Sequence, residues 1–148
     1  MVKTMSNNIN QIKVEDVMLS LDKFPILIHH QLFQEALEAM NKFKHGVACV
    51  VNKNNELMGI ITDGDIRRKL LKVQKPISAF FVDDVLDHSI LNPVTTNYRS
   101  NLIDAVELMG LKQIWDLPVI DDKNALVGLL HLHPAIKSIL HDKTMNKI

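Results

Sequence analysis

The sequence has little of what marks a secreted or membrane-bound protein. Its single cysteine, Cys49, leaves no internal disulfide available among 148 residues, and a reducing cytoplasm is the default compartment. No apolar run approaches the roughly 20 residues that cross a bilayer. Residues 1–10 are polar and lack the apolar core of a signal peptide. These absences favour a cytoplasmic protein without a membrane partner.

An excess of charge is absent too, and so are the common catalytic motifs. The 17 basic residues balance 17 acidic ones, which argues against nucleic acid as a partner. There is no nucleophile elbow, no His-Glu metal helix and no Walker-type glycine loop. We therefore expect no catalytic residues and no metal site. The 47% hydrophobic content is enough for a core, in one domain or two very small ones.

What the sequence does contain is an internal repeat. Gly128 follows Gly59 by 69 residues, and Ala105 follows Ala36 by the same number. An offset held across a helix, two strands and a turn is the strongest signal in the chain. A half of about 60 residues buries too little surface alone, so we expect two halves around a shared core and a pseudo-twofold axis. The predicted division is a flexible lead or linker 1–12, repeats 13–78 and 79–141, and a tail 142–148.

The periodicity of apolar residues predicts the elements of each copy. In the first we expect a helical turn at 14–18, strands at 24–28, 47–51 and 57–61, helices at 32–44 and from the corner through 66–73, with Gly46 ending the first helix. Residues 82–86 echo 13–18, 93–95 echo 25–27, 105–109 echo 36–40, and 119–130 echo 50–61. The predicted fold is α/β, with two β-α-β-β-α repeats.

A strand–turn–helix corner at residues 62–68 carries the most chemistry. Thr62 and Asp63 are good N-cap residues, and a helix start attracts anions. Asp65 can accept hydrogen bonds from a sugar diol, and Arg67 and Arg68 can bind phosphate. The alternative is an ordinary capped turn with solvated arginines.

These residues carry a resemblance. Two such repeats, with Leu-Met-Gly-Ile-Ile-Thr-Asp-Gly-Asp at 57–65, resemble a tandem pair of cystathionine-β-synthase (CBS) domains over residues 13–141. The resemblance implies a regulatory nucleotide-binding module. The stretches 62–68 and 128–133 together are most similar to the C-terminal CBS pair of bacterial arabinose-5-phosphate isomerases of the Kdo pathway. Sugar-phosphate nucleotidyltransferases with leading CBS pairs share the first stretch and fit the second less well.

The resemblance also implies a ligand site in the first repeat. Thr62 and Asp65 would hold a ribose, the two arginines would face phosphate or a sugar-acid carboxylate, and the base would lie near the first strand and Ala48. The expected nucleotide-binding residues are Ile26, Ile28, Ala48, Thr62, Asp63, Asp65, Arg67 and Arg68. The candidate regulatory ligands are AMP, ADP or ATP, and CMP-Kdo; no catalytic cofactor is expected. The rival interpretation is a degenerate pocket that is only structural.

The second repeat departs from this pattern. The offset places His131 at the position of Thr62 and Pro134 at that of Asp65, and proline cannot clamp a ribose diol. A second cleft would be formed by Thr95, Pro118, His131 and His133. If the two histidines alternate on a strand, they share a face. They could then bind an anion or sugar, hold a metal, or be structural; no third zinc ligand is visible at suitable spacing.

Three functional hypotheses follow. The first is a homodimeric regulatory module that binds a nucleotide and signals to a sugar-isomerase domain, in the same chain or another. The chain has no room for that domain, so we expect either an excised regulatory half or a stand-alone relative. The second is a dimerisation module without a ligand, and the third, disfavoured by the missing catalytic set, is a small enzyme.

Overall fold

The computed structural model describes residues 12–146, and side chains through residue 142. It contains two compact units, which we treat separately. The β1–β4 unit consists of Leu21–Pro93 and Lys123–Leu126, and the β5–β7 unit consists of residues 12–20, Val94–Asp122 and the chain from Val127 onward. No helix in the described part is long and apolar enough to span a bilayer. The expected lead 1–12 lies almost wholly outside the described residues.

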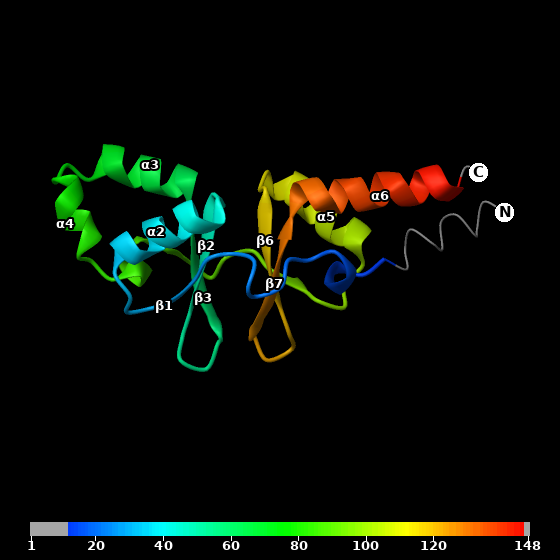
Figure 1. Ribbon diagram of the computed structural model, residues 1–148, viewed down its shortest axis with the longest axis horizontal. Coiled ribbons are helices and arrows are strands. Elements are labelled where there is room, and N and C mark those ends of the chain that lie inside the picture. The colour runs from blue at the N-terminus through cyan, green and yellow to red at the C-terminus, as the bar shows by residue number, and fades with distance from the viewer. Residues whose placement is uncertain (1–11, 147–148) are drawn as a thin grey trace. The chain divides into compact units, whose positions relative to one another are not determined.

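The β1–β4 unit is a four-stranded sheet with helices packed on one face (Figure 1). β1 runs parallel to β2, and β2–β3 and β3–β4 are antiparallel. Its elements are β1 (Ile26–Ile28), α2 (Phe33–Phe43), β2 (Val47–Val51), β3 (Leu57–Thr62), α3 (Asp63–Lys72), α4 (Ile77–Phe81), η2 (Val85–His88) and β4 (Ile90–Leu91).

The core of this unit explains why α2 lies where it does. Phe33, Ala36 and Met40 follow the three- and four-residue spacing of one helix face, and they pack with the alternate strand residues Ala48 and Val50. The helix does not end at Gly46 as expected. It ends at Lys44, whose φ of 56° is left-handed. Gly46 has no positive φ.

Gly46 is required for close approach instead. A Cβ added there would lie 2.7 Å from Oδ2 of Asp63, the first residue of α3. The amide of Asp63 also donates to the Gly46 carbonyl at 3.0 Å. The glycine therefore lets the α2–β2 loop pack directly against the start of α3.

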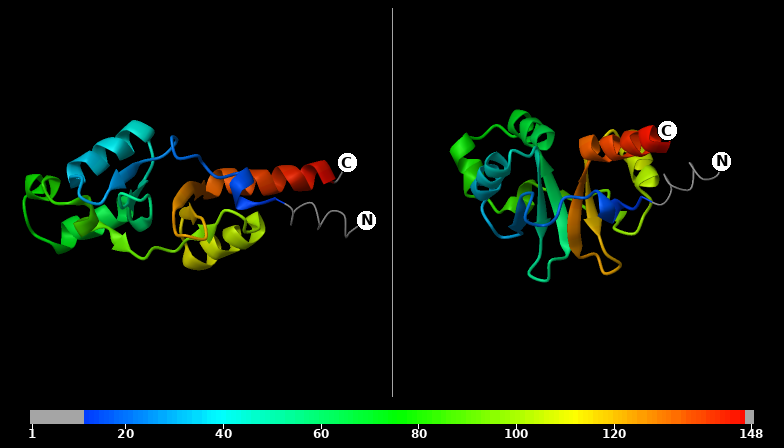
Figure 2. Two further views of the ribbon diagram at one scale, coloured as in Figure 1. Left: turned by 90° about the horizontal axis from the view of Figure 1, so that it is seen from below. Right: turned by 45° about the vertical axis from the view of Figure 1, so that its right-hand side comes forward.

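The β5–β7 unit repeats this plan with a three-stranded sheet, order β5-β6-β7. Figure 2 shows α5 and α6 running beside each other over that sheet. Its elements are η1 (Val14–Asp16), β5 (Thr96–Asn97), α5 (Leu102–Lys112), β6 (Asp116–Ile120), β7 (Leu126–His131) and α6 (Leu132–Asn146). α5 ends at Gln113, φ 55°, which lies 69 residues after Lys44.

The short 3-10 turns show a different offset from the rest of the repeat. Val14 opens η1 and Val85 opens η2, both are fully buried, and they lie 71 residues apart. The echo of 82–86 with 13–18 was therefore misaligned, because it matched residues by an Asp-Val pair and not by burial. Val82 is in fact exposed. Among residues 12–146, each compact unit has one such turn, and the β5–β7 unit takes its turn from residues that precede β1.

The two repeated glycines explain how each turn segment meets its sheet. A Cβ on Gly59 would lie 2.8 Å from the carbonyl oxygen of Ile90, and one on Gly128 would lie 2.8 Å from that of Leu19. Ile90 pairs with β3 as part of β4, and Leu19 pairs with Leu129 of β7. Both glycines are needed because the paired backbone comes too close to leave room for a Cβ.

Two elements were not expected from the sequence. α4 follows Pro76 and contributes Phe80, which is buried in the core of the β1–β4 unit. The two residues of β4 are both exposed, so they lack the apolar alternation by which a strand is recognised.

Candidate functional site

The β3–α3 corner is formed by the end of a strand and the first turn of a helix. Thr62 is the N-cap of α3, and its Oγ1 accepts a hydrogen bond from the amide of Asp65 at 3.2 Å. The same hydroxyl donates to Oδ2 of Asp65 at 2.6 Å. The threonine therefore satisfies a free helix N–H and fixes the carboxylate at the same time. The carboxylate also lies where the helix dipole stabilises negative charge.

The other carboxylate oxygen of Asp65 faces an arginine of the same helix. Nη2 of Arg68 donates to Oδ1 of Asp65 at 2.8 Å. The Asp65 side chain is 15% exposed and that of Arg68 is 64% exposed. Each carboxylate oxygen has lone pairs left, so Asp65 can still accept hydrogen bonds from a ligand. Arg67 is exposed and forms no ion pair with any other residue in the described part of the chain.

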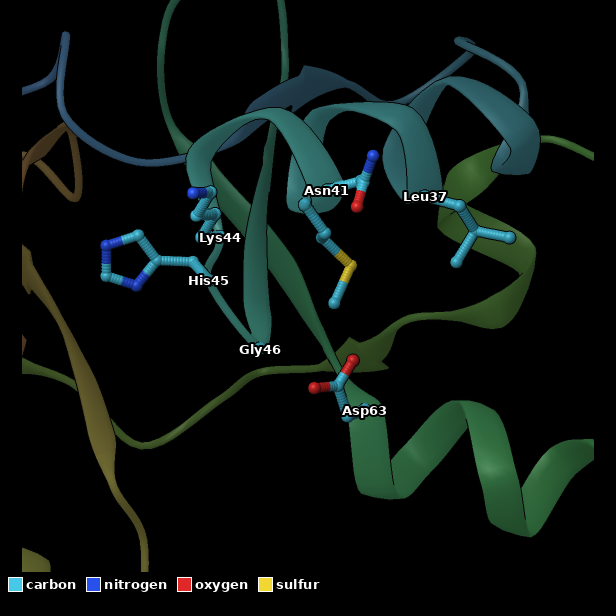
Figure 3. Close-up of a pocket in the computed structure, with 7 residues that line it drawn as sticks. Leu37, Asn41, Lys44, His45, Gly46 and Asp63 are labelled. Carbon is cyan, nitrogen blue, oxygen red and sulfur yellow. The ribbon is translucent and has the colours of Figure 1, made fainter.

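A pocket of about 440 Å³ adjoins this corner (Figure 3). Asp63 lines it from the start of α3, facing the C-terminal part of α2. The complete lining is Leu37, Met40, Asn41, Lys44, His45, Gly46 and Asp63. Of these residues only Asp63 was expected in a site. The others were not recognised because they end an amphipathic helix, where polar residues are usually capping or solvated.

The residues expected to contact a base do not share one face of the sheet. Ile26 pairs with Cys49, and Ala48 is the next residue of β2, so the two side chains project from opposite faces. Ala48 is fully buried in the core with α2. Ile26 and Ile28 lie on the same face as Thr62, which pairs with Val47. The structure therefore groups the two isoleucines with Thr62 and separates Ala48 from them.

The corresponding corner of the second repeat is arranged differently. Nδ1 of His131 lies 2.8 Å from Oδ1 of Asp116. The offset places Asp116 at the position of Val47, the strand partner of Thr62. One backbone contact is kept, because the Leu132 amide donates to the Trp115 carbonyl at 2.9 Å as Asp63 does to Gly46. The polar contact thus runs from β7 to β6 in the second repeat, whereas in the first it runs from Thr62 into its own helix.

We had expected His131 and His133 to alternate on a strand, and they do not. β7 ends at His131 and α6 begins at Leu132, so His133 lies in the first turn of a helix and is exposed. Among the described residues, no group of three or more His, Cys, Asp or Glu side chains is placed to hold a metal ion.

The other residues expected in the second cleft occupy matching places in the β5–β7 sheet. Thr96 pairs with Val119 as Leu27 pairs with Val50, so Thr95 corresponds to Ile26. The expected match of 93–95 with 25–27 was therefore one residue out of register. Pro118 is buried, on the face opposite its core neighbours Leu117 and Val119.

Asp83, whose carboxyl has a shifted pKa, lies outside the β3–α3 corner. Nζ of Lys75 lies 2.8 Å and Nε2 of His88 2.7 Å from Oδ2 of Asp83. These contacts, that of Lys75 first, hold the pKa of Asp83 below its ordinary value. The His88 ring stands between those of Phe33 and Phe80, with centroids 4.9 and 5.3 Å away. This cluster fastens α2 and α4 to η2 and presents no ligand-binding feature.

Comparison with known proteins agrees with the repeat, the corner and the fold. Residues 14–72 match the model of the CBS domain family. CBSX2, a CBS-pair protein of Arabidopsis thaliana whose structure was solved in complex with AMP, is 26% identical, with a TM-score of 0.77, over 89% of this chain and 98% of that one. This chain is a CBS-domain pair. Its tandem α/β architecture confirms the expected fold.

Sequence relatives of this CBS pair include sugar-phosphate isomerases. The probable arabinose 5-phosphate isomerase of Haemophilus influenzae is 36% identical over 118 residues, which are 80% of this chain and 33% of that protein. The arabinose 5-phosphate isomerase KdsD of Francisella tularensis is 31% identical over 128 residues, 85% of this chain and 37% of that protein. The chain thus spans about a third of the length of the curated relatives it matches.

Proposed function

We propose that this CBS pair is a regulatory module that binds one nucleotide or nucleotide-sugar per chain, at the β3–α3 corner of the first repeat. The observation that carries the proposal is the Asp65 carboxylate, held by Thr62 at a helix N-terminus with acceptor capacity to spare. The AMP complex of CBSX2 supports a nucleotide ligand. The second repeat supports a single site, because Pro134 replaces the carboxylate and His131 is paired with Asp116.

Each group at the corner has a definite role in this proposal. Asp65 and Thr62 bind the ribose hydroxyls, since a carboxylate is a strong acceptor for a diol. Arg67 and Arg68 bind the phosphate, and the base packs against Ile26 and Ile28. AMP, ADP and ATP fit this arrangement, and so does a nucleotide-sugar such as CMP-Kdo, whose sugar-acid carboxylate would be a further anion for the arginines.

The regulated partner in this proposal is a sugar-phosphate isomerase domain, in the same chain or a separate one. The isomerases of Haemophilus influenzae and Francisella tularensis support it, since both are about three times as long as the segment they share with this chain. A ligand regulates such a domain only as far as it favours one arrangement of the module over another. The module would act in the cytoplasm as a homodimer.

A second candidate function is dimerisation without a ligand. It is favoured by large apolar side chains left exposed in each unit: Leu71 (76%) and Val82 (68%) in one, and Leu111 (79%) and Trp115 (72%) in the other. Where such side chains form a contiguous patch, they mark an interaction surface.

Calorimetric titration with AMP, ATP and CMP-sugars tests the first candidate. We expect one ligand per parent chain, and at least tenfold weaker binding after Asp65→Ala, since charge-assisted hydrogen bonds contribute about 1.5–3 kcal/mol each. Asp104→Ala is the matched control, because Asp104 is an exposed carboxylate in the first turn of α5. Unchanged binding by Asp65→Ala would refute the site, and absence of binding by the parent would favour the dimerisation module. Sedimentation at tens of micromolar measures the dimer in either case.

A further inference from the structure

Asp65 has a partner of its own in the place where a ligand would bind. Its Oδ2 accepts from Thr62, which is part of the corner, but its Oδ1 accepts from the guanidinium of Arg68. A nucleotide would therefore bind to two groups, the Asp65 carboxylate and the Arg68 guanidinium, that are already bound to each other. Hydroxyls need the carboxylate, and phosphate needs the guanidinium.

The backbone makes room for this internal pair. Arg68 lies one helical turn after Gly64, and its head folds back over that glycine. A Cβ at Gly64 would lie 3.1 Å from both Nη1 and Nη2 of Arg68. Gly64 has no positive φ, so the conformation does not demand glycine. A Cβ there would require the guanidinium to move by a few tenths of an ångström.

We infer that Arg68 is an internal latch on Asp65 that selects phosphorylated ligands, an inference that rests on the proposed function. A nucleoside without phosphate has to share Oδ1 with the guanidinium, which crowds the ribose hydroxyls, and it offers the guanidinium no other anion. A nucleotide offers phosphate, which draws Arg68 off the carboxylate while the ribose hydroxyls take its place. One arginine thus opposes binding of the nucleoside and supports binding of the nucleotide.

The expected change in ligand affinity follows from how exposed the Arg68 side chain is. Arg68 is 64% exposed, and ion pairs of exposed side chains contribute up to about 1 kcal/mol. Removing the latch should therefore tighten nucleoside binding by about two- to fivefold. Losing a charge-assisted bond to phosphate should weaken nucleotide binding by about tenfold. The ratio of the two affinities should consequently fall by about twenty- to fiftyfold.

Titration of adenosine and AMP against the parent and three variants tests the latch. Arg68→Ala should tighten adenosine and weaken AMP. Arg67→Ala is the control for charge, because Arg67 is the exposed neighbour with no ion pair among the described residues; it should weaken AMP and leave adenosine unchanged. Gly64→Ala should press on the guanidinium and weaken its bond to Asp65 without removing it, and so tighten adenosine by less than Arg68→Ala does while keeping AMP binding.

The outcomes separate the latch from the proposed function. If the parent binds AMP but Arg68→Ala leaves adenosine affinity unchanged or weaker, the latch is wrong and the nucleotide site stands. If Arg67→Ala tightens adenosine as much as Arg68→Ala does, net charge explains the effect and the latch is again wrong. If the parent binds neither compound up to millimolar concentration, the latch is wrong. If it binds neither ATP nor CMP-sugars as well, the proposed function fails with it.

Discussion

Asn55 and Asn124 hold the tips of the two repeated hairpins together by a reciprocal set of bonds. Nδ2 of Asn55 donates to the Leu126 carbonyl at 2.8 Å, and Nδ2 of Asn124 donates to the Leu57 carbonyl at 3.1 Å. The amides of Leu126 and Leu57 donate back to the carbonyls of Asn55 and Asn124, at 2.9 and 3.0 Å. Both asparagines have positive φ, 63° and 66°. Two residues at equivalent positions thus make the same two bonds to each other's strand.

Replacing either asparagine should destabilise the fold measurably. Asn55→Ala removes a hydrogen bond of about 0.5–1.5 kcal/mol and places alanine in the left-handed region, at about 1 kcal/mol more. We expect a loss of roughly 1.5–2.5 kcal/mol in the free energy of unfolding, measured in urea. Asn124→Ala should behave alike.

Asn55→Gly separates the two causes, because glycine accepts the positive φ and lacks only the amide. It should lose less than Asn55→Ala. Since the two asparagines bond to the same short segments, the double alanine variant should deviate from additivity by at least 0.5 kcal/mol. Strict additivity of the two substitutions would contradict the reciprocal arrangement.

The repeated glycines should tolerate alanine poorly, in contrast to a third glycine. Gly128→Ala places a Cβ 2.8 Å from the Leu19 carbonyl oxygen, so it should cost about 1–3 kcal/mol by overpacking. Gly110 lies within α5 and has no atom within 4 Å of an added Cβ. Gly110→Ala should therefore stabilise by roughly 0.5–1 kcal/mol. Thermal unfolding of both variants checks the opposite signs; a destabilised Gly110→Ala would contradict the explanation.

The Asp83 cluster should make stability depend on acidic pH. Because its neighbours lower the pKa of Asp83 in the fold, the ionised carboxylate stabilises the fold above the unfolded pKa of about 3.9. This contribution is lost as pH falls through the lower folded pKa. Asp83→Asn should therefore be less stable than the parent at pH 6, and the difference should shrink as pH falls below about 4.

Asp84→Asn is the control for this dependence, since Asp84 is the exposed neighbour and its side chain does not cap η2. Its unfolding free energy should differ little from that of the parent over the same range, measured by urea titration at pH 3, 4, 5 and 6. A constant difference between the parent and Asp83→Asn across these values would show that charge at Asp83 is unimportant.

Rebuilding the corner of the second repeat should create a second site if the proposed function holds. His131→Thr combined with Pro134→Asp restores a threonine and a carboxylate three residues apart, at the start of α6. Calorimetry with AMP should change from one to two ligands per chain. Asp116→Val belongs in the same variant, because Asp116 otherwise loses its partner His131. Two ligands per chain in the parent would contradict the single-site proposal.

Sequence patterns predicted the repeated part of the fold well. β2 was placed at its observed bounds, and α2, β3 and α3 within a few residues, because their apolar periodicity follows directly from a helix or strand packed on a core. Ala36 and Ala105 are both buried in the helices where the 69-residue offset had put them.

The features that were missed depend on contacts distant in the sequence. The 69-residue offset of the main helices and strands could not match the buried Val14 to Val85, since the turn segment of the β5–β7 unit comes from the start of the described chain. To predict that His131 pairs with Asp116, one would need the order of the strands in the sheet as well as the 69-residue offset. For the corner at Thr62 and Asp65, the residue types sufficed to predict the cap, but not that Arg68 lies on the carboxylate.

The β5–β7 unit takes its turn segment from residues that precede β1, and this also affects the order in which the chain folds during synthesis. Leu19 pairs with Leu129, which leaves the ribosome 110 residues later. Residues 21–93 include all four strands of one sheet, so most of that unit can form while synthesis continues. The segment 12–20 has to wait for β7. Vectorial synthesis therefore imposes an order of assembly, in which the earliest described residues are among the last to reach their final pairing.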